Sequence, residues 1–87
     1  MADEERRRAL IERWIEPHPW RRNAAEAVLK DSALSVWALI GYLRMVDGDR
    51  HRTAVDYGIT DEEVEAALAY YHENQAVIDA RLAANAA

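Results

Sequence analysis

Apolar residues recur every three or four positions in several segments of the chain, which is the spacing of an amphipathic helix. The first of these stripes consists of Leu10, Ile11, Trp14 and Ile15. Asp3 can cap the start of this helix, whereas Pro17 and Pro19 cannot continue it. We therefore expect an N-terminal helix over residues 1–16 and an extended connector after it.

The segment from Asn23 to Leu34 carries two competing signals. Asn23 and Glu26 have the spacing of a capping box ahead of an alanine-rich turn, which favours a helix. Val28 and Leu29 suit a short strand equally well. The local pattern leaves helix and strand open, so residues 17–34 are predicted only as a connector that holds one short element.

A second apolar stripe predicts a helix that opens at Ser35 and ends near Gly48. Its members are Val36, Leu39, Ile40, Leu43 and Val46. Asp49 can cap a shorter helix, which should stop at Gly58. With the last helix of the chain, these two segments should form a trihelical unit over residues 35–84.

The last helix carries two signals at its start. Thr60 and Glu63 have the spacing of a capping box, and Ile59 and Val64 can form a hydrophobic staple across the same end. An apolar seam then continues at steps of four and three through Val64, Leu68, Tyr71, Ile78 and Leu82. A helix unbroken to about Ala84 would be roughly 36 Å long.

A seam of that length exceeds what a three-helix unit can cover, and an apolar seam is unfavourable in water. We therefore expect a homodimer through the long last helix. Its interface should contain Leu68, Tyr71, Ile78 and Leu82.

The stretch from Asp49 to Tyr71 has the spacing of a helix-turn-helix. This motif needs a small residue where the helices touch, a glycine in the turn and branched apolar residues on the second helix. The residues that supply these features, in order, are Ala54, Gly58, Ile59 and Val64. An ordinary helical hairpin also uses a glycine and a cap, so it stays an alternative.

The length of 87 residues predicts a single domain over residues 1–87. Although 51% of the residues are hydrophobic, alanine supplies much of that share and phenylalanine is absent. The core of so short a chain is therefore thin. A second copy of the chain could complete it, which again favours a homodimer.

Several classes of site find no support in the sequence. There is no cysteine, and His18, His51 and His72 lack metal-ligand spacing, so we expect no metal. No convergent set of titratable groups predicts an enzyme, a catalytic residue or a cofactor. No apolar run is long enough for a bilayer, and Met1 to Arg8 lack the layout of a signal peptide. We expect a cytoplasmic protein with no membrane partner.

The charge pattern bears on DNA binding. A net charge of −5 argues against sequence-independent binding over the whole surface. The residues that would face a major groove from the second helix are acidic or small: Thr60, Asp61, Glu62, Glu65, Ala66 and Ala69. Phosphates would repel these carboxylates. The candidate DNA contacts are therefore four arginines and the cap of the second helix, namely Arg21, Arg22, Arg50, Arg52 and Thr60.

The chain resembles domain-of-unknown-function family 433. The segment from Leu29 to Trp37 (LKDSALSVW) is similar to the family pattern Ile-Lys-Gly-Thr-x-Ile-Pro-Val-Trp. The resemblance covers roughly residues 26–84. It continues through residues 38–43 (ALIGYL), 47–49 (DGD), 56–57 (DY), 64–71 (VEAALAYY) and 78–82 (IDARL). The chain departs from the pattern at Asp31, where glycine is usual, and at Ser35, where proline is usual. It should also have an N-terminal helix in place of the family's first strand.

Proteins of that family are small prokaryotic proteins with a homeodomain-like trihelical fold, regarded as antitoxin-like and often encoded beside a PIN-type toxin. The resemblance implies a mainly α, helix-turn-helix fold, with one short strand near Ala27 to Lys30. It also implies an antitoxin-like protein that dimerises and binds a cognate toxin, with operator DNA as a further partner. The alternative is a dimeric protein–protein interaction module with the same fold and no DNA binding.

Overall fold

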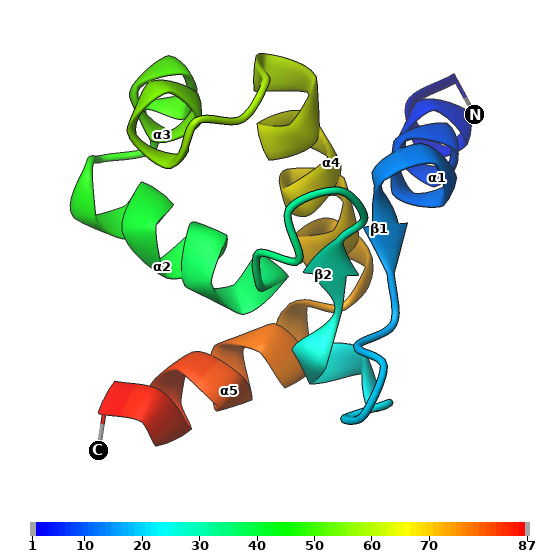
Figure 1. The fold of residues 1–87 in the computed structure, drawn as a ribbon, viewed down its shortest axis with the longest axis vertical. Helices are drawn as coiled ribbons and strands as arrows, with labels where there is room; N and C mark the ends of the chain where they lie inside the picture. Colours follow the sequence, from blue (N-terminus) through cyan, green and yellow to red (C-terminus); the bar gives the residue numbers. More distant parts are fainter. Residues whose placement is uncertain (1, 87) are drawn as a thin grey trace.

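The computed structural model describes residues 2–86 and is mainly helical, as the sequence predicts. Its elements are α1 (Ala2–Trp14), β1 (Ile15–Glu16), the 3-10 helix η1 (Ala24–Glu26), β2 (Val28–Leu29), α2 (Val36–Met45), α3 (Arg50–Tyr57), α4 (Asp61–Glu73) and α5 (Gln75–Ala86). Helix α4 lies in the middle of the molecule, with α2 and α3 on one side and α1 on the other (Figure 1).

The segment that could be helix or strand contains both elements in succession. Asn23 caps η1, and its side chain accepts a hydrogen bond from the backbone N of Ala25 at 3.1 Å. The strand expected within Ala27 to Lys30 is confirmed as β2. It pairs antiparallel with β1, so that Ile15 lies opposite Leu29.

This pairing corrects two expectations about the N-terminal part. The first helix ends at Trp14, two residues earlier than predicted, and the chain does have a strand before β2. The two prolines that follow cannot continue the helix, and β1 buries Ile15 to 7% exposure against the core. A two-residue strand is too short to show an alternating pattern, and Ile15 also fits the stripe of the preceding helix.

Helices α3 and α4 are joined by the short turn, Gly58 to Thr60, that the helix-turn-helix spacing predicts. The Asp49 side chain caps α3 by accepting a bond from the backbone N of Arg52 at 3.0 Å. Gly58 ends α3 in the left-handed conformation, with φ at +67°. Thr60 and Glu63 form the reciprocal capping box at the start of α4. The turn between the two helices is therefore set by short-range signals that the sequence shows.

The prediction of one unbroken helix to Ala84 is wrong. Asn74 leaves helical geometry, with φ at −136°, and its side-chain amide donates to the backbone O of Tyr70 at 3.0 Å. Helix α5 then turns back beneath α2 (Figure 1). This turn carries Ile78 into the core, where its side chain is fully buried.

The residues of the apolar seam therefore pack within their own chain. Leu68, Tyr71 and Leu82 pack against the same core as Ile78, and Leu82 closely approaches Gly41 of α2. The Tyr71 hydroxyl donates to Asp79 at 2.8 Å, and Arg44 contacts the same carboxylate at 2.6 Å. These bonds hold the pKa of Asp79 below its ordinary value. The apolar seam thus no longer requires a dimer through these residues.

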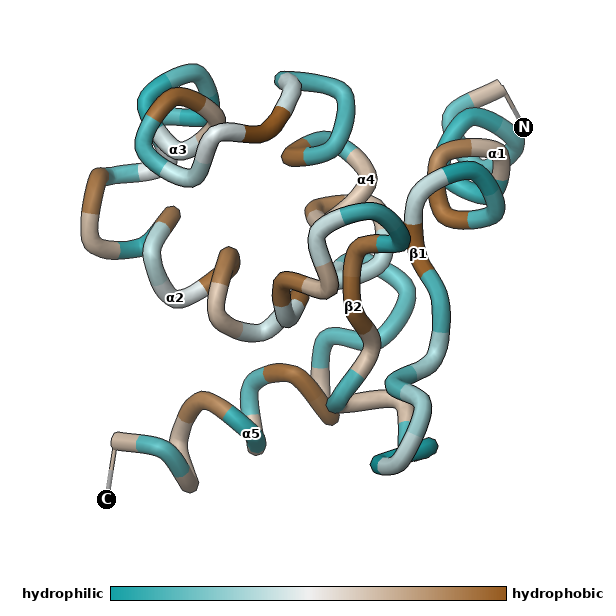
Figure 2. Tube along the Cα trace, viewed as in Figure 1, coloured by the Kyte–Doolittle hydropathy of each residue, from teal (hydrophilic) through white to brown (hydrophobic). Residues whose placement is uncertain are grey.

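The core lies between α2, α4, α5 and the small sheet, where Figure 2 shows hydrophobic stretches turned inward. Its largest fully buried side chains are Leu29, Leu39, Ile78, Val36, Val64 and Thr53. Across residues 2–86, every buried side-chain nitrogen and oxygen has a hydrogen-bond partner. None of the helices in this range combines the length and apolar character needed to cross a bilayer.

Candidate partner-binding interface

Helix α1 lies antiparallel along α4. Arg7 contacts Glu73 at 3.1 Å near one end of the pair, and the Trp14 indole donates to Glu62 at 2.7 Å near the other. Between these contacts α4 presents alanines, which let the two helices approach closely. Ala66 and Ala69 are 0% and 4% exposed as a result.

This packing changes the picture of the second helix as a DNA reader. Ala66 and Ala69, which were expected to face a groove, are buried. Thr60 is engaged in the capping box, because its hydroxyl accepts from the backbone N of Glu63 at 3.1 Å. Glu62 is bonded to Trp14. Helix α1 therefore occupies part of the surface that would have to approach a base edge.

The structure does not bring the four candidate arginines together. Arg50 and Arg52 lie on α3 and pair with carboxylates, Arg50 with Glu65 at 2.6 Å. Arg21 and Arg22 lie on the connector, at the opposite side of the view in Figure 1. Arg21 reaches Glu26 only at 3.9 Å. No carboxylate of residues 2–86 lies within ion-pair distance of Arg22.

The connector is a defined turn rather than a loose extension. The Nδ1 atom of His18 accepts hydrogen bonds from the backbone N of Trp20 at 3.1 Å and of Arg21 at 3.0 Å. Both bonds require Nδ1 to carry no proton. The turn projects the Trp20 side chain into solvent, where it is 85% exposed.

Trp20 is the residue that the sequence interpretation missed. The available signal was its position, since it stands between Pro19 and two arginines, outside every apolar stripe. Contiguous exposed apolar surface marks binding sites, so the surroundings of Trp20 decide whether its exposure has a role.

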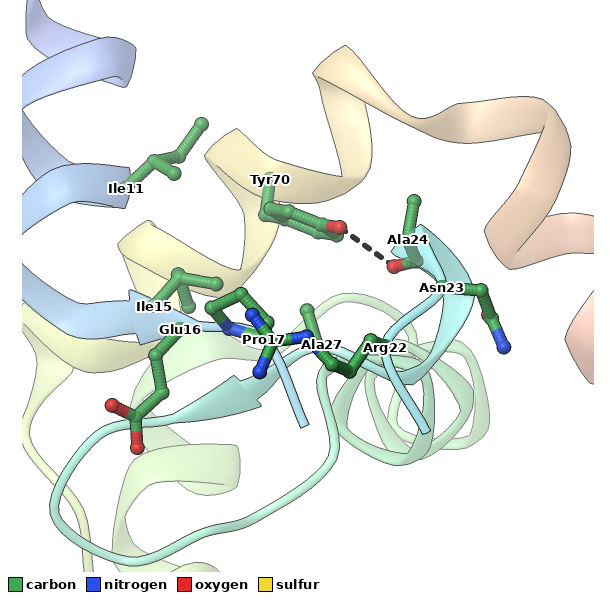
Figure 3. A pocket seen from close by; sticks show the side chains of 9 residues that line it. All are labelled: Ile11, Ile15, Glu16, Pro17, Arg22, Asn23, Ala24, Ala27 and Tyr70. Carbon is green, nitrogen blue, oxygen red and sulfur yellow. Dashed lines mark hydrogen bonds between the residues drawn. The ribbon is translucent and has the colours of Figure 1, made fainter. Parts of the chain in front are cut away.

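A hollow of about 350 Å³ lies beside this turn. Its apolar walls come from α1, β1, the connector, η1 and α4 (Figure 3). They are formed by Ile11, Ile15, Pro17, Ala24, Ala27 and Tyr70. Glu16 and Arg22 stand among these walls as the charged members. We call the turn of residues 18–22 and this hollow, together, the connector surface.

Tyr70 of α4 lines the hollow and connects α4 to η1 through a hydrogen bond. Its hydroxyl donates to the backbone O of Ala24 at 2.6 Å, the bond drawn in Figure 3. Burial raises the pKa of the Tyr70 phenol, because the charged form is less well solvated there. The neutral phenol is therefore the form that fits the folded state.

Tyr70→Phe should lower the free energy of unfolding by about 1 kcal/mol at neutral pH, since one hydrogen bond is lost. A raised folded-state pKa gives stability that is present below the pKa of an unfolded tyrosine, about 10, and is lost as pH rises from there. The variant should therefore lose less stability than wild type above pH of about 10. Urea unfolding of wild type and variant at neutral pH and above pH of about 10 checks this difference in stability, with Tyr57→Phe as the matched control. An unchanged alkaline decline would contradict the role of Tyr70.

Other chemistry has less support in the part of the chain that is described. Residues 2–86 contain no group of three histidine or acidic side chains placed to hold a metal ion. The connector surface is the feature that joins an exposed aromatic ring, cationic groups and an apolar hollow. Comparisons of the chain with protein-family models, with curated proteins and with solved structures found no match.

Proposed function

We propose that this protein is an antitoxin-like binding module that recognises another protein through its connector surface. The observation that carries the proposal is the 85% exposure of Trp20, in a turn that also carries Arg21 and Arg22. Arg22 of this turn lines the apolar hollow. Tryptophan and arginine are enriched among residues that dominate binding energy at protein interfaces. Covering Trp20 would remove its ring from water, which is favourable.

The class of partner is suggested by the resemblance to family 433. In this proposal the partner is a PIN-like toxin, and the complex forms in the cytoplasm. Homodimerisation remains a proposal, but at a surface other than the one expected, since Ile78 is buried within its own chain.

Operator DNA is the less favoured partner. Helix α1 covers Ala66 and Ala69, and the exposed start of α4 carries Asp61 and Glu62. Arg50, a candidate phosphate contact, is already paired with Glu65. These contacts favour the alternative in which the helix-turn-helix supports a protein-binding surface and does not itself read bases.

The proposal is tested by a growth assay with the product of the neighbouring gene. Expression of that product alone should arrest growth, and co-expression of this protein should restore growth and yield a stable complex. A neighbouring product that leaves growth unaffected when expressed alone would contradict the antitoxin role.

Trp20→Ala should abolish the rescue of growth and weaken the complex at least about a hundredfold, as loss of a dominant interface residue does. Its melting temperature should stay unchanged, because the side chain is exposed. Met45→Ala is the matched control, since Met45 is 80% exposed on α2 and lies outside the connector surface. Equal weakening by both variants would contradict a specific role for Trp20.

A further inference from the structure

We infer that the connector surface receives an acidic segment of its partner, with a carboxylate on Arg22 and a neighbouring apolar side chain in the hollow. This inference rests on the proposed function for the existence of a partner. It adds the chemistry by which that partner is recognised.

The hollow itself favours an apolar occupant. Ile11, Ile15 and Ala27 contribute only carbon side chains to its walls. The one phenol among the lining residues, that of Tyr70, already donates to the backbone O of Ala24. An occupant therefore meets a ring and aliphatic groups, and gains most by burying an apolar side chain.

The charges beside the hollow favour a carboxylate next to that apolar group. Glu26 forms an ion pair with Arg81 at 2.6 Å, so the longer contact of Arg21 with Glu26 contributes little to neutralising this carboxylate. Arg22 has no carboxylate within ion-pair distance among residues 2–86 and lines the hollow. A guanidinium binds a carboxylate through two parallel hydrogen bonds. The carboxylate of Glu16 points away from Tyr70 in Figure 3, so it leaves the hollow itself open.

The same charges favour an acidic peptide over a nucleic acid. A long polyanion would be repelled by a protein whose net charge is −5. It would also approach the carboxylates of Glu16 and Glu26 beside the turn. A short acidic segment needs only the two arginines of the connector. The apolar side chain of such a segment can also be buried in the hollow, whereas a phosphate backbone offers no apolar group.

The test uses NMR to follow binding of a blocked pentapeptide to the full chain. The peptide has leucine at its centre and acidic residues on both sides. Addition of this peptide should shift the signals of the Trp20 indole and of the Ala24, Ala27 and Tyr70 amides. Replacing the flanking acids by lysine, or the leucine by alanine, should weaken binding about tenfold or more. Arg22→Gln should weaken it about tenfold, the size expected for a lost charge-assisted bond. Arg52→Gln is the matched control, because Arg52 lies on α3.

Three outcomes would overturn the inference. These are equal affinity for the lysine peptide, signal shifts confined to the start of α4, and tighter binding of a single-stranded oligonucleotide of about twelve bases than of the acidic peptide. The failure of the inference can be told from failure of the proposed function. Suppose that Trp20→Ala abolishes growth rescue, while Arg22→Gln does not and the acidic peptide does not bind. The proposed partner-binding function is then supported, and recognition of an acidic segment is wrong.

Discussion

Ile78→Asp should leave the chain largely unfolded at room temperature. Ile78 is fully buried in the core of its own chain. Removing a buried isoleucine side chain costs about 2–5 kcal/mol, and an unpaired buried carboxylate adds several more. The total stability of such a domain is only about 5–15 kcal/mol. Circular dichroism should therefore show loss of helix, and not merely a change of oligomeric state.

The neighbouring residue supplies the control for this prediction. Val77 lies on the same helix and is 42% exposed, so Val77→Asp should change stability by less than about 0.5 kcal/mol. If Ile78 instead served a dimer interface, the loss of stability would depend on protein concentration. A folded, monomeric Ile78→Asp variant would show that the turn between α4 and α5 is placed wrongly.

Gly58→Val should be the next most damaging change, with a loss of about 1–3 kcal/mol. Gly58 has φ at +67°, a conformation that a β-branched side chain resists. A Cβ atom built there meets nothing within 4 Å, so the loss comes from the backbone conformation and not from a clash. The melting temperature should fall by about 4–8 °C for each kcal/mol lost.

Two milder substitutions at the same position check that cause. Gly58→Asn should lose less than Gly58→Ala, and both should lose less than the valine variant, because asparagine tolerates the left-handed region best. The order should be visible in thermal unfolding. If valine and asparagine have equal effects, the left-handed turn does not determine the stability of this motif.

The parts of the fold that the sequence predicts are those specified by short-range chemistry. The caps at Asp49 and Thr60 and the glycine at the end of α3 each lie within a few residues of the helix end that they define. The strand at Val28 was indicated by the resemblance, since the local pattern suited a helix equally well. Local signals therefore place the helix-turn-helix to within one or two residues.

The errors involve contacts between distant parts of the chain. The periodic seam continues across Asn74, but the helix breaks there and Ile78 joins the core beside α2. The covering of Ala66 by α1 joins residues far apart in sequence, which no local pattern reveals. The exposure of Trp20 is the exception, because it depends on a local turn that the side chain of His18 holds through two backbone hydrogen bonds.

Hydrogen–deuterium exchange of the complex with the neighbouring gene product tests the central proposal most directly. It compares the free protein with the complex and reports which backbone amides the partner covers. The connector surface predicts slower exchange over residues 17–27 and at Tyr70, with residues 60–66 unchanged. Protection confined to residues 60–66, at the start of α4, would contradict it and return the binding role to the second helix of the helix-turn-helix.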